Sequence, residues 1–138
     1  MHLKGNRIGF VLLRYNPTME YIARNPINGN CVQLLVAEGS VNYMQLVRPS
    51  KTNLFFTPGF CDLQVNGGFG IDLNAKALTV EQVSRLNQEL LRHGVTCWCP
   101  TIITGEVELM CHNLEMVATA CREDPLVQQC VIGIHLEG

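Results

Sequence analysis

The alternation of strand-like and helix-like segments after Pro58 constrains the fold more than any other feature of the sequence. Short apolar runs at 60–65, 95–99 and 130–136 predict β-strands, and amphipathic stretches at about 79–94 and 105–122 predict helices between them. Thr79 followed by Gln82 is typical of a capping box at a helix start, and Pro100 is expected to end the second strand. Two strand–helix–strand crossovers in succession predict an α/β fold with a parallel sheet.

The residues before Pro58 have a different pattern. Three apolar runs, at 8–13, 31–37 and 41–47, predict β-strands, and no helical periodicity persists between them. Glu38-Gly39-Ser40 joins the second and third runs and predicts a β-hairpin. We therefore expect residues 1–57 to form a few antiparallel strands and residues 58–138 to form the α/β part.

Composition excludes several classes of protein. Of the 138 residues 47% are hydrophobic and 16% are charged, which is typical of a chain with a packed core. The formal net charge of −2 favours neither nucleic acid nor an anionic membrane as a partner. The apolar runs are shorter than the ~18–20 residues of a membrane span, and no export signal is evident. We expect a cytoplasmic protein that binds no membrane.

The cysteines are expected to be reduced and buried. Seven is an odd number, and most of these residues lie within apolar periodic segments. Cys97 and Cys99 form a close pair, but the sequence offers no second pair of ligands at the spacing of a structural zinc site.

Polar residues follow each predicted strand of the second part, where parallel sheets and barrels carry their chemistry. Gln64 and Asn66 follow the first strand at a spacing that points both side chains to one side. His135 and Glu137 share that spacing at the end of the third strand. Neutral amides suit the orientation of a water or a substrate carbonyl, whereas Asn66 with Gly67 is also typical of a turn. Glu137 is either a metal ligand or a carboxylate bonded to backbone amides or exposed in a loop, and His135 is favoured as a hydrogen-bonded interior histidine.

Other polar residues have structural interpretations. His93 lies in the last turn of a predicted helix, where a cation suits the helix dipole, and His112 lies within the next helix. Asp62 and Asp72 flank the glycine-rich segment and are expected to cap loops. That segment lacks the glycine spacing of a dinucleotide fold, so nucleotide binding is not predicted.

Three segments together resemble a known family. Residues 58–70 (PGFCDLQVNGGFG), 93–101 (HGVTCWCPT) and 133–138 (GIHLEG) closely resemble N-acetylglucosamine-6-phosphate deacetylase, of the amidohydrolase superfamily. The Gln-x-Asn-Gly-Gly form combined with His-Leu-Glu-Gly indicates this deacetylase branch. The resemblance covers about residues 58–138. Residues 35–41 look like the hairpin of the family's small domain, and residues 1–30 have no clear counterpart.

The resemblance implies a (β/α)8 TIM-type barrel with a small β-sandwich domain. Residues 58–138 would form the first three strands and two helices of that barrel, and residues 1–57 part of the sandwich. Glu137 would be a ligand of a divalent metal ion, zinc or a similar one, and Gln64 and Asn66 would lie near the metal and substrate. The reaction would be hydrolysis of the acetyl amide of N-acetylglucosamine 6-phosphate to glucosamine 6-phosphate and acetate. No catalytic residue falls in this sequence, because the general-base Asp is expected downstream. The partner would be a small amino-sugar phosphate, and the full-length form a homodimer.

The length does not suit a whole enzyme of this kind. A barrel takes ~250 residues, and a catalytic metal needs about three protein ligands. We therefore expect an N-terminal fragment that is inactive alone. One alternative is a non-catalytic truncated product. Another is an amidohydrolase with a different cyclic amide substrate, which the Gln64/Asn66 pair disfavours because such enzymes resemble His-x-His at this strand.

Overall fold

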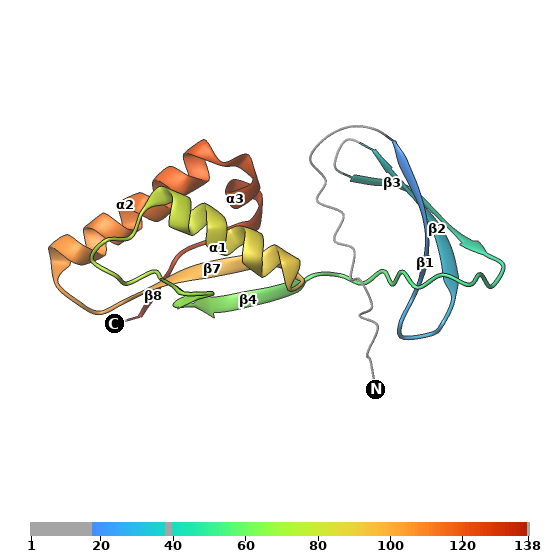
Figure 1. Ribbon diagram of the computed structural model, residues 1–138, viewed down its shortest axis with the longest axis horizontal. Coiled ribbons are helices and arrows are strands. Elements are labelled where there is room, and N and C mark those ends of the chain that lie inside the picture. Colours follow the sequence, from blue (N-terminus) through green and yellow to red (C-terminus); the bar gives the residue numbers. More distant parts are fainter. Residues whose placement is uncertain (1–17, 38–39, 138) are drawn as a thin grey trace. The chain divides into compact units, whose positions relative to one another are not determined.

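The computed structural model describes residues 18–37 and 40–137 (Figure 1). The chain divides after Pro58 into two compact units, residues 1–58 and 59–138. The strand predicted at 8–13 and the turn residues 38–39 lie outside the described residues. Within the described part, every helix is too short or too polar to cross a membrane.

The first unit contains an antiparallel sheet in the order β1-β2-β3. Its strands are β1 (Met19–Arg24), β2 (Cys31–Ala37) and β3 (Ser40–Val47). The antiparallel pairing of β2 with β3 confirms the predicted hairpin, whereas β1 was not predicted. Between β1 and β2 the chain reverses over residues 25–30, where the side chain of Asn25 accepts a hydrogen bond from the backbone of Ile27 (2.8 Å). The small core of this unit is made of buried side chains from β1 and β2: Ala23, Cys31, Val32 and Val36.

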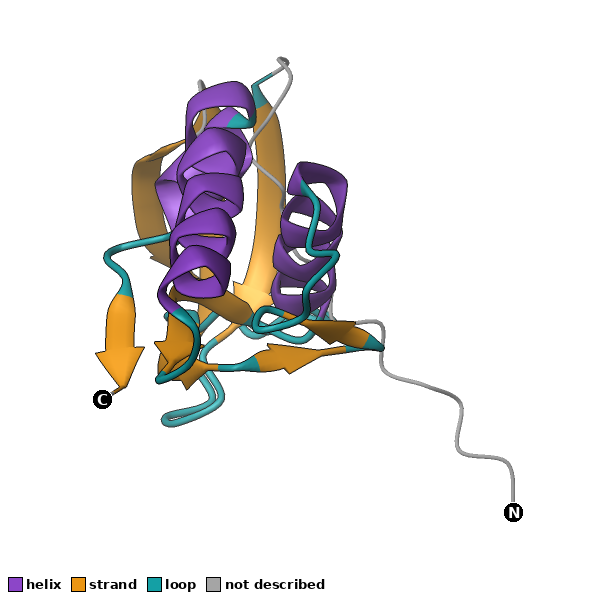
Figure 2. Cartoon of the chain, turned by 90° about the vertical axis from the view of Figure 1, so that its left-hand side faces the viewer, coloured by secondary structure: helices purple, strands orange, loops and turns teal. Residues whose placement is uncertain are grey.

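The second unit is mixed α/β, and its main sheet has the order β4-β7-β8 with parallel pairing throughout. The elements of this unit are β4 (Phe60–Val65), β5 (Gly67–Gly68), β6 (Ile71–Asp72), α1 (Val80–Arg92), β7 (Val95–Ile103), α2 (Val107–Glu123), α3 (Pro125–Cys130) and β8 (His135–Glu137). Figure 1 shows the helices on one side of this sheet, and Figure 2 shows α1 and α2 side by side. The α/β class predicted from the sequence is confirmed.

Helix α1 begins and packs as its sequence predicts. The Thr79 side chain accepts a hydrogen bond from the Gln82 backbone, and the Gln82 side chain accepts one from the Thr79 backbone, so the capping box is complete. The predicted apolar stripe of α1 is buried at Val83, Leu86 and Leu90 against the sheet and α2. The helix ends at Arg92 with His93 as its C-cap, and Gly94 follows with φ +90, a conformation that favours glycine.

The core between the helices and the sheet is centred on Trp98 of β7, which is fully buried. Its indole N–H donates to Oδ1 of Asn87, a buried residue of α1, at 2.8 Å. This bond satisfies the polar atom of the largest core side chain, and it fixes α1 against the middle strand of the sheet.

Two predicted strand boundaries were wrong. Strand β7 continues through Pro100 to Ile103, because the proline falls where pairing with β4 is irregular and a missing N–H is least costly. The strand predicted at 130–136 is shorter than expected: Cys130 is the last residue of α3, Val131 forms an isolated parallel bridge with Trp98, and residues 132–134 are irregular. Helix α3 begins with a proline, and its N-terminus is capped by Asp124, which accepts from the Leu126 backbone (2.8 Å). Only residues 135–137 remain as β8.

The cysteines are all free, as predicted, but their burial differs from the prediction. Cys31 and Cys130 are buried, whereas Cys61 and Cys111 are exposed. Burial raises the pKa of the Cys130 thiol. At Cys61 the pKa is raised mainly by a hydrogen bond with Cys97, its neighbour across β4 and β7.

Candidate functional site

Two of the predicted site residues meet at the carboxyl edge of the β4-β7-β8 sheet. Gln64, near the end of β4, donates from Nε2 to Oε2 of Glu137, at the end of β8, over 3.2 Å. These two strands lie on opposite sides of β7, so the contact reaches across the end of the middle strand. Both side chains are exposed, which leaves their remaining polar atoms open to a ligand.

A β-bulge in β4 directs Gln64 to this position. The pairing of β4 with β7 runs from Asp62–Trp98 to Val65–Pro100, so β4 advances three residues where β7 advances two. Val65 consequently lies on the same side of the sheet as Trp98, the side that packs against the helices. Because neighbouring side chains in a strand alternate, Gln64 points to the opposite face, toward Glu137.

The end of β8 is fixed by its contacts with the end of β7. Glu137 pairs with Ile103, and its carbonyl oxygen accepts a hydrogen bond from the Thr104 hydroxyl at 2.8 Å. On the same strand, Nδ1 of the half-buried His135 lies 3.5 Å from the Thr101 hydroxyl. This contact agrees with the interpretation of His135 as a hydrogen-bonded histidine.

Asn66 is exposed and follows β4, and its side chain is not hydrogen-bonded to Gln64 or Glu137. Its carbonyl oxygen accepts a hydrogen bond from the backbone of Leu73 (3.0 Å), which closes a small hairpin formed by β5 and β6. The turn of this hairpin lies at Phe69 and Gly70, both with positive φ, and not at Asn66-Gly67 as the sequence suggested. The hairpin therefore fixes the backbone at Asn66.

Asn74 is the residue that sequence reasoning missed. Its Nδ2 donates to the carbonyl of Thr101 (3.1 Å), and its Oδ1 accepts from the backbone N–H of Ile103 (2.9 Å). The backbone N–H of Asn74 in turn donates to Oδ1 of Asp72 (2.8 Å). One amide side chain thus binds both polar groups at the end of β7, the strand that carries Glu137's partner Ile103. No short-range pattern in the sequence predicts this role, because Thr101 and Ile103 lie 27 and 29 residues from Asn74 along the chain.

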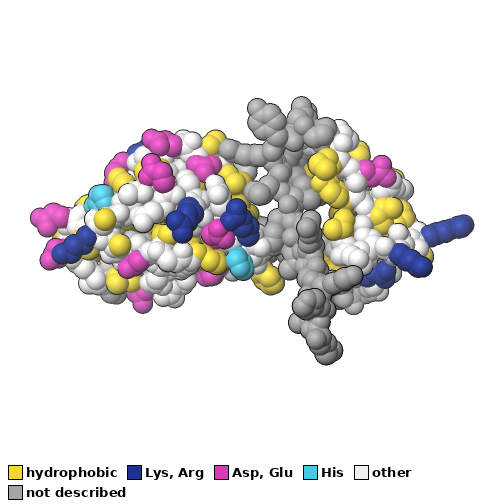
Figure 3. Space-filling view, in the orientation of Figure 1, with side chains coloured by type: hydrophobic (Ala, Val, Ile, Leu, Met, Phe, Trp, Pro, Cys, Tyr) yellow, Lys and Arg dark blue, Asp and Glu magenta, His cyan; other side chains and the backbone are white. Residues whose placement is uncertain are grey.

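The other polar residues singled out in the sequence have structural partners. Nδ1 of His93 lies 2.8 Å from the Glu89 carbonyl, and Nε2 of His112 lies 3.1 Å from the Leu78 carbonyl. Oδ1 of Asp62 accepts from the backbone of Gln64 at 3.1 Å within β4, at its bulge and not in a loop, whereas Asp72 accepts from the backbone of Asn74 after β6, as predicted for a loop cap. On the face of the second unit that Figure 3 shows, acidic and basic side chains are interspersed.

The donor atoms at this edge fit one side of a site for a hard divalent ion. The Glu137 carboxylate has a second oxygen beyond the one that Gln64 contacts, and Gln64 carries an amide oxygen; both are ligands that such ions accept. Within residues 18–37 and 40–137, no three His, Cys, Asp or Glu side chains converge as metal ligands would. The Glu137 carboxylate and the Gln64 amide oxygen are thus the atoms at this edge that could hold one side of such an ion.

The fold belongs to a class seen in a solved enzyme structure. Residues covering 78% of the chain superimpose with a TM-score of 0.63 on 29% of the crystal structure of N-acetylglucosamine-6-phosphate deacetylase from Pasteurella multocida, at 24% identity. At this identity the likeness is one of fold. A scan against models of known protein families finds no match.

Comparison with curated sequences narrows the likeness to sugar-phosphate deacetylases. The chain is 37% identical over 82 residues to N-acetylglucosamine-6-phosphate deacetylase of Bos taurus and 35% identical over 82 residues to that of Homo sapiens; each match takes in 59% of this chain and 20% of the relative. It is 31% identical over 110 residues to N-acetylgalactosamine-6-phosphate deacetylase of Escherichia coli O157:H7, with 77% of this chain and 28% of the relative covered. The predicted resemblance to these deacetylases is confirmed, and the chain spans about a fifth of the length of the mammalian relatives.

Proposed function

We propose that this chain supplies the first part of a divalent-metal-dependent amidohydrolase that removes the acetyl group from N-acetylglucosamine 6-phosphate. The proposal rests above all on the hydrogen bond between Gln64 and Glu137, which brings the ends of β4 and β8 together at one edge. Both residues lie in the segments whose sequence resembles the deacetylases. The proposed architecture is the opening section of a (β/α)8 barrel, residues 58–138, with residues 1–57 contributing to a small β-sandwich domain.

In this proposal Glu137 is the metal ligand of the chain and Gln64 is its neighbour. The amide N–H of Gln64 occupies one carboxylate oxygen, which limits rotation of the Glu137 side chain and leaves the other oxygen for the ion. A bound zinc or similar divalent ion supplies Lewis-acid chemistry, polarising the acetyl carbonyl and lowering the pKa of a water. Asn66, fixed by the hairpin behind it, lines the same rim and orients the substrate.

The remaining parts of the reaction come from residues beyond this sequence. A catalytic metal takes about three protein ligands, and one carboxylate provides only the first. The general-base Asp, which passes a proton to the departing amine, is placed there too. In this proposal the full-length enzyme is a cytoplasmic homodimer that acts on a small sugar phosphate and binds neither nucleic acid nor membrane.

A second substrate is also supported. The relative from Escherichia coli O157:H7 is named for N-acetylgalactosamine 6-phosphate. This sugar differs from N-acetylglucosamine 6-phosphate in the orientation of a single hydroxyl, so the same acetamide chemistry serves both. Discrimination between them would depend on a hydrogen bond to that hydroxyl.

A segment exchange tests the proposal. The 82-residue segment that matches in the Bos taurus relative is replaced by the matching segment of this chain, and acetate release is measured with both sugar phosphates. We expect activity in the hybrid and a loss of at least roughly 10–100-fold on Glu137→Gln, because changing groups that only orient metal ligands already costs that much. Glu106→Gln, at an exposed position before α2, is the matched control and should leave activity unchanged. A folded hybrid that retains activity with Glu137→Gln would remove Glu137 from the metal site.

The isolated chain provides a second test. With one carboxylate ligand it should purify without stoichiometric zinc, as measured by atomic emission. A tightly bound equivalent of zinc in the 138-residue protein would contradict the proposal that the site is completed elsewhere.

A further inference from the structure

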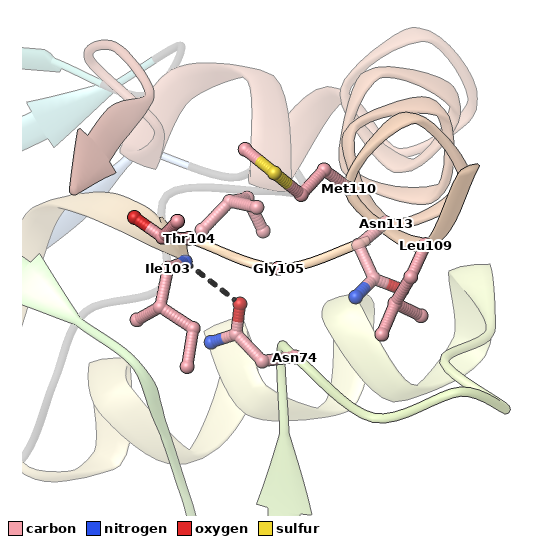
Figure 4. A pocket seen from close by; sticks show the side chains of 8 residues that line it. Asn74, Ile103, Thr104, Gly105, Leu109, Met110 and Asn113 are labelled. Carbon is pink, nitrogen blue, oxygen red and sulfur yellow. Dashed lines mark hydrogen bonds between the residues drawn. The ribbon is translucent and has the colours of Figure 1, made fainter. Parts of the chain in front are cut away.

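A cavity of about 90 Å³ lies between the end of β7 and the first turns of α2 (Figure 4). It is on the helix side of the sheet, at the level of the buried Ile102, whereas Gln64 and Glu137 meet on the other face. Its walls are mainly apolar, formed by Ile102, Ile103, Leu109 and Met110. Polar groups enter from Asn74, Thr104, the Gly105 backbone and Asn113.

Asn113 brings an unpaired amide to this cavity. The residue is 1% exposed, and its Oδ1 has no hydrogen-bond partner in the part of the chain that the structure describes. Figure 4 shows the Asn113 side chain extending from α2 toward the cavity, with its amide nitrogen on the side of Asn74 and its oxygen on the side of Leu109. Native proteins rarely leave a buried acceptor without a donor. We therefore expect Oδ1 of Asn113 to accept a hydrogen bond from a donor that the described residues do not supply.

The other polar side chains around the cavity already have partners. Both polar atoms of Asn74 are bonded to the backbone of β7, at Thr101 and Ile103. The Thr104 hydroxyl donates to the carbonyl of Glu137. Among the side chains that line the cavity, Asn113 therefore carries the buried polar atom that lacks a partner.

The size and polarity of the cavity define the ligand. A single water needs roughly 10–15 Å³ of such space and two to four polar partners, so 90 Å³ with apolar walls suits a small molecule better than a group of waters. No charged side chain is among the eight lining residues, which disfavours both anions and cations. The Asn113 amide offers one donor group and one acceptor, and a carboxamide pairs with both at once.

We propose that this cavity is a binding site for a small neutral carboxamide, with the amide paired to Asn113 and the alkyl part against Leu109 and Met110. The site stands on these contacts alone and does not depend on the proposed deacetylase function. Because Thr104 lies both on the cavity wall and against the Glu137 backbone, a bound amide would also adjoin the end of β8.

The experiment titrates acetamide into the full 138-residue protein labelled with 15N and with 13C at the methionine methyl groups. We expect saturable shifts of the Asn113 side-chain amide and the Met110 methyl. Acetate, which is charged, and acetone, which lacks an N–H donor, have the same shape and should bind at least tenfold more weakly. Equal binding of acetone and acetamide, or no saturable shift, would overturn the proposal and leave water as the occupant.

Two variants separate recognition from general stability. Asn113→Leu removes the amide at similar volume and should abolish the acetamide shifts while preserving the remainder of the spectrum. Met110→Phe fills the cavity but retains Asn113, and it should also abolish binding. Acetamide binding of unchanged affinity in either folded variant would refute the assignment. If one variant fails to fold, the other variant still tests the proposal.

Discussion

The side chain of Asn74 is predicted to be a main determinant of order at the candidate site. It spans the end of β7 by donating to Thr101 and accepting from Ile103, and Ile103 pairs directly with Glu137. Asn74→Ala removes both hydrogen bonds and leaves the Ile103 N–H without its acceptor. The end of β7, and β8 with it, should then open more readily.

The size of the effect follows from the two lost bonds. An intramolecular hydrogen bond contributes about 0.5–1.5 kcal/mol net, so the loss of two predicts a decrease of about 1–3 kcal/mol in the free energy of unfolding. For a unit of this size each kcal/mol lowers the melting temperature by roughly 4–8 °C. A decrease of about 10 °C is therefore the central expectation for the second unit.

Urea denaturation followed by the fluorescence of Trp98 measures this loss, because Trp98 is the single tryptophan and is buried in the second unit. Hydrogen exchange of the Ile103 amide reports the local opening. Asn66→Ala, an exposed asparagine of the same unit, is the matched control and should stay within about 0.5 kcal/mol of the wild type. If Asn74→Ala is no less stable than this control and the Ile103 amide remains protected, the reasoning fails.

Three further changes test separate parts of the second unit. Thr79→Ala breaks the capping box of α1 and should lower the unfolding free energy by about 1 kcal/mol in the same urea assay; an unchanged midpoint would contradict the cap. Gly67→Ala puts a Cβ 2.3 Å from the Ile71 carbonyl oxygen at φ +154, so calorimetry should show a lower melting temperature, and a stabilised variant would exclude this close approach. The Arg122 guanidinium and the Thr119 hydroxyl hold the pKa of Glu115 below its usual value. The ion pair of Glu115 with Arg122 therefore stabilises the fold at pH values above the ordinary carboxyl pKa, and this stabilisation is lost as the pH falls through the lowered pKa of Glu115. In Arg122→Gln, a carboxyl NMR titration should find the pKa of Glu115 raised, and no rise would refute the pairing.

Local signals in the sequence predicted the elements whose ends are set by neighbouring residues. The capping box of Thr79 and Gln82 fixes the start of α1, and Gly94 supplies the left-handed residue after it. Strand β4 has the predicted bounds, 60–65. The meeting of Gln64 with Glu137 could also be anticipated, because carboxyl ends of parallel strands share one edge of a sheet.

The failures have a common physical origin in contacts between distant residues. Pro100 was expected to end a strand, but pairing on both sides of β7 carries that strand through it. At 130–136 the apolar composition predicts one continuous strand, but pairing with β7 is limited to a bridge at Val131 and to β8, because the path of the chain along β7 decides where pairing occurs. The amides of Asn74 and Asn113 look like ordinary polar positions in the sequence, since their surroundings are formed only by the fold.

The β-bulge between Asp62 and Val65 lets two consecutive residues of β4, Leu63 and Gln64, share the face of the sheet that carries Glu137. Removal of Leu63 would restore regular pairing and keep Gln64 on that face, whereas removal of Gln64 itself would leave Leu63 there in its place. Removal of both residues would place Asp62 directly before Val65, so that one of the two would have to leave the helix side of the sheet. Loss of a single residue in this stretch should therefore be tolerated only where Gln64 is retained, so that the identity of the deleted residue matters more than the change in length.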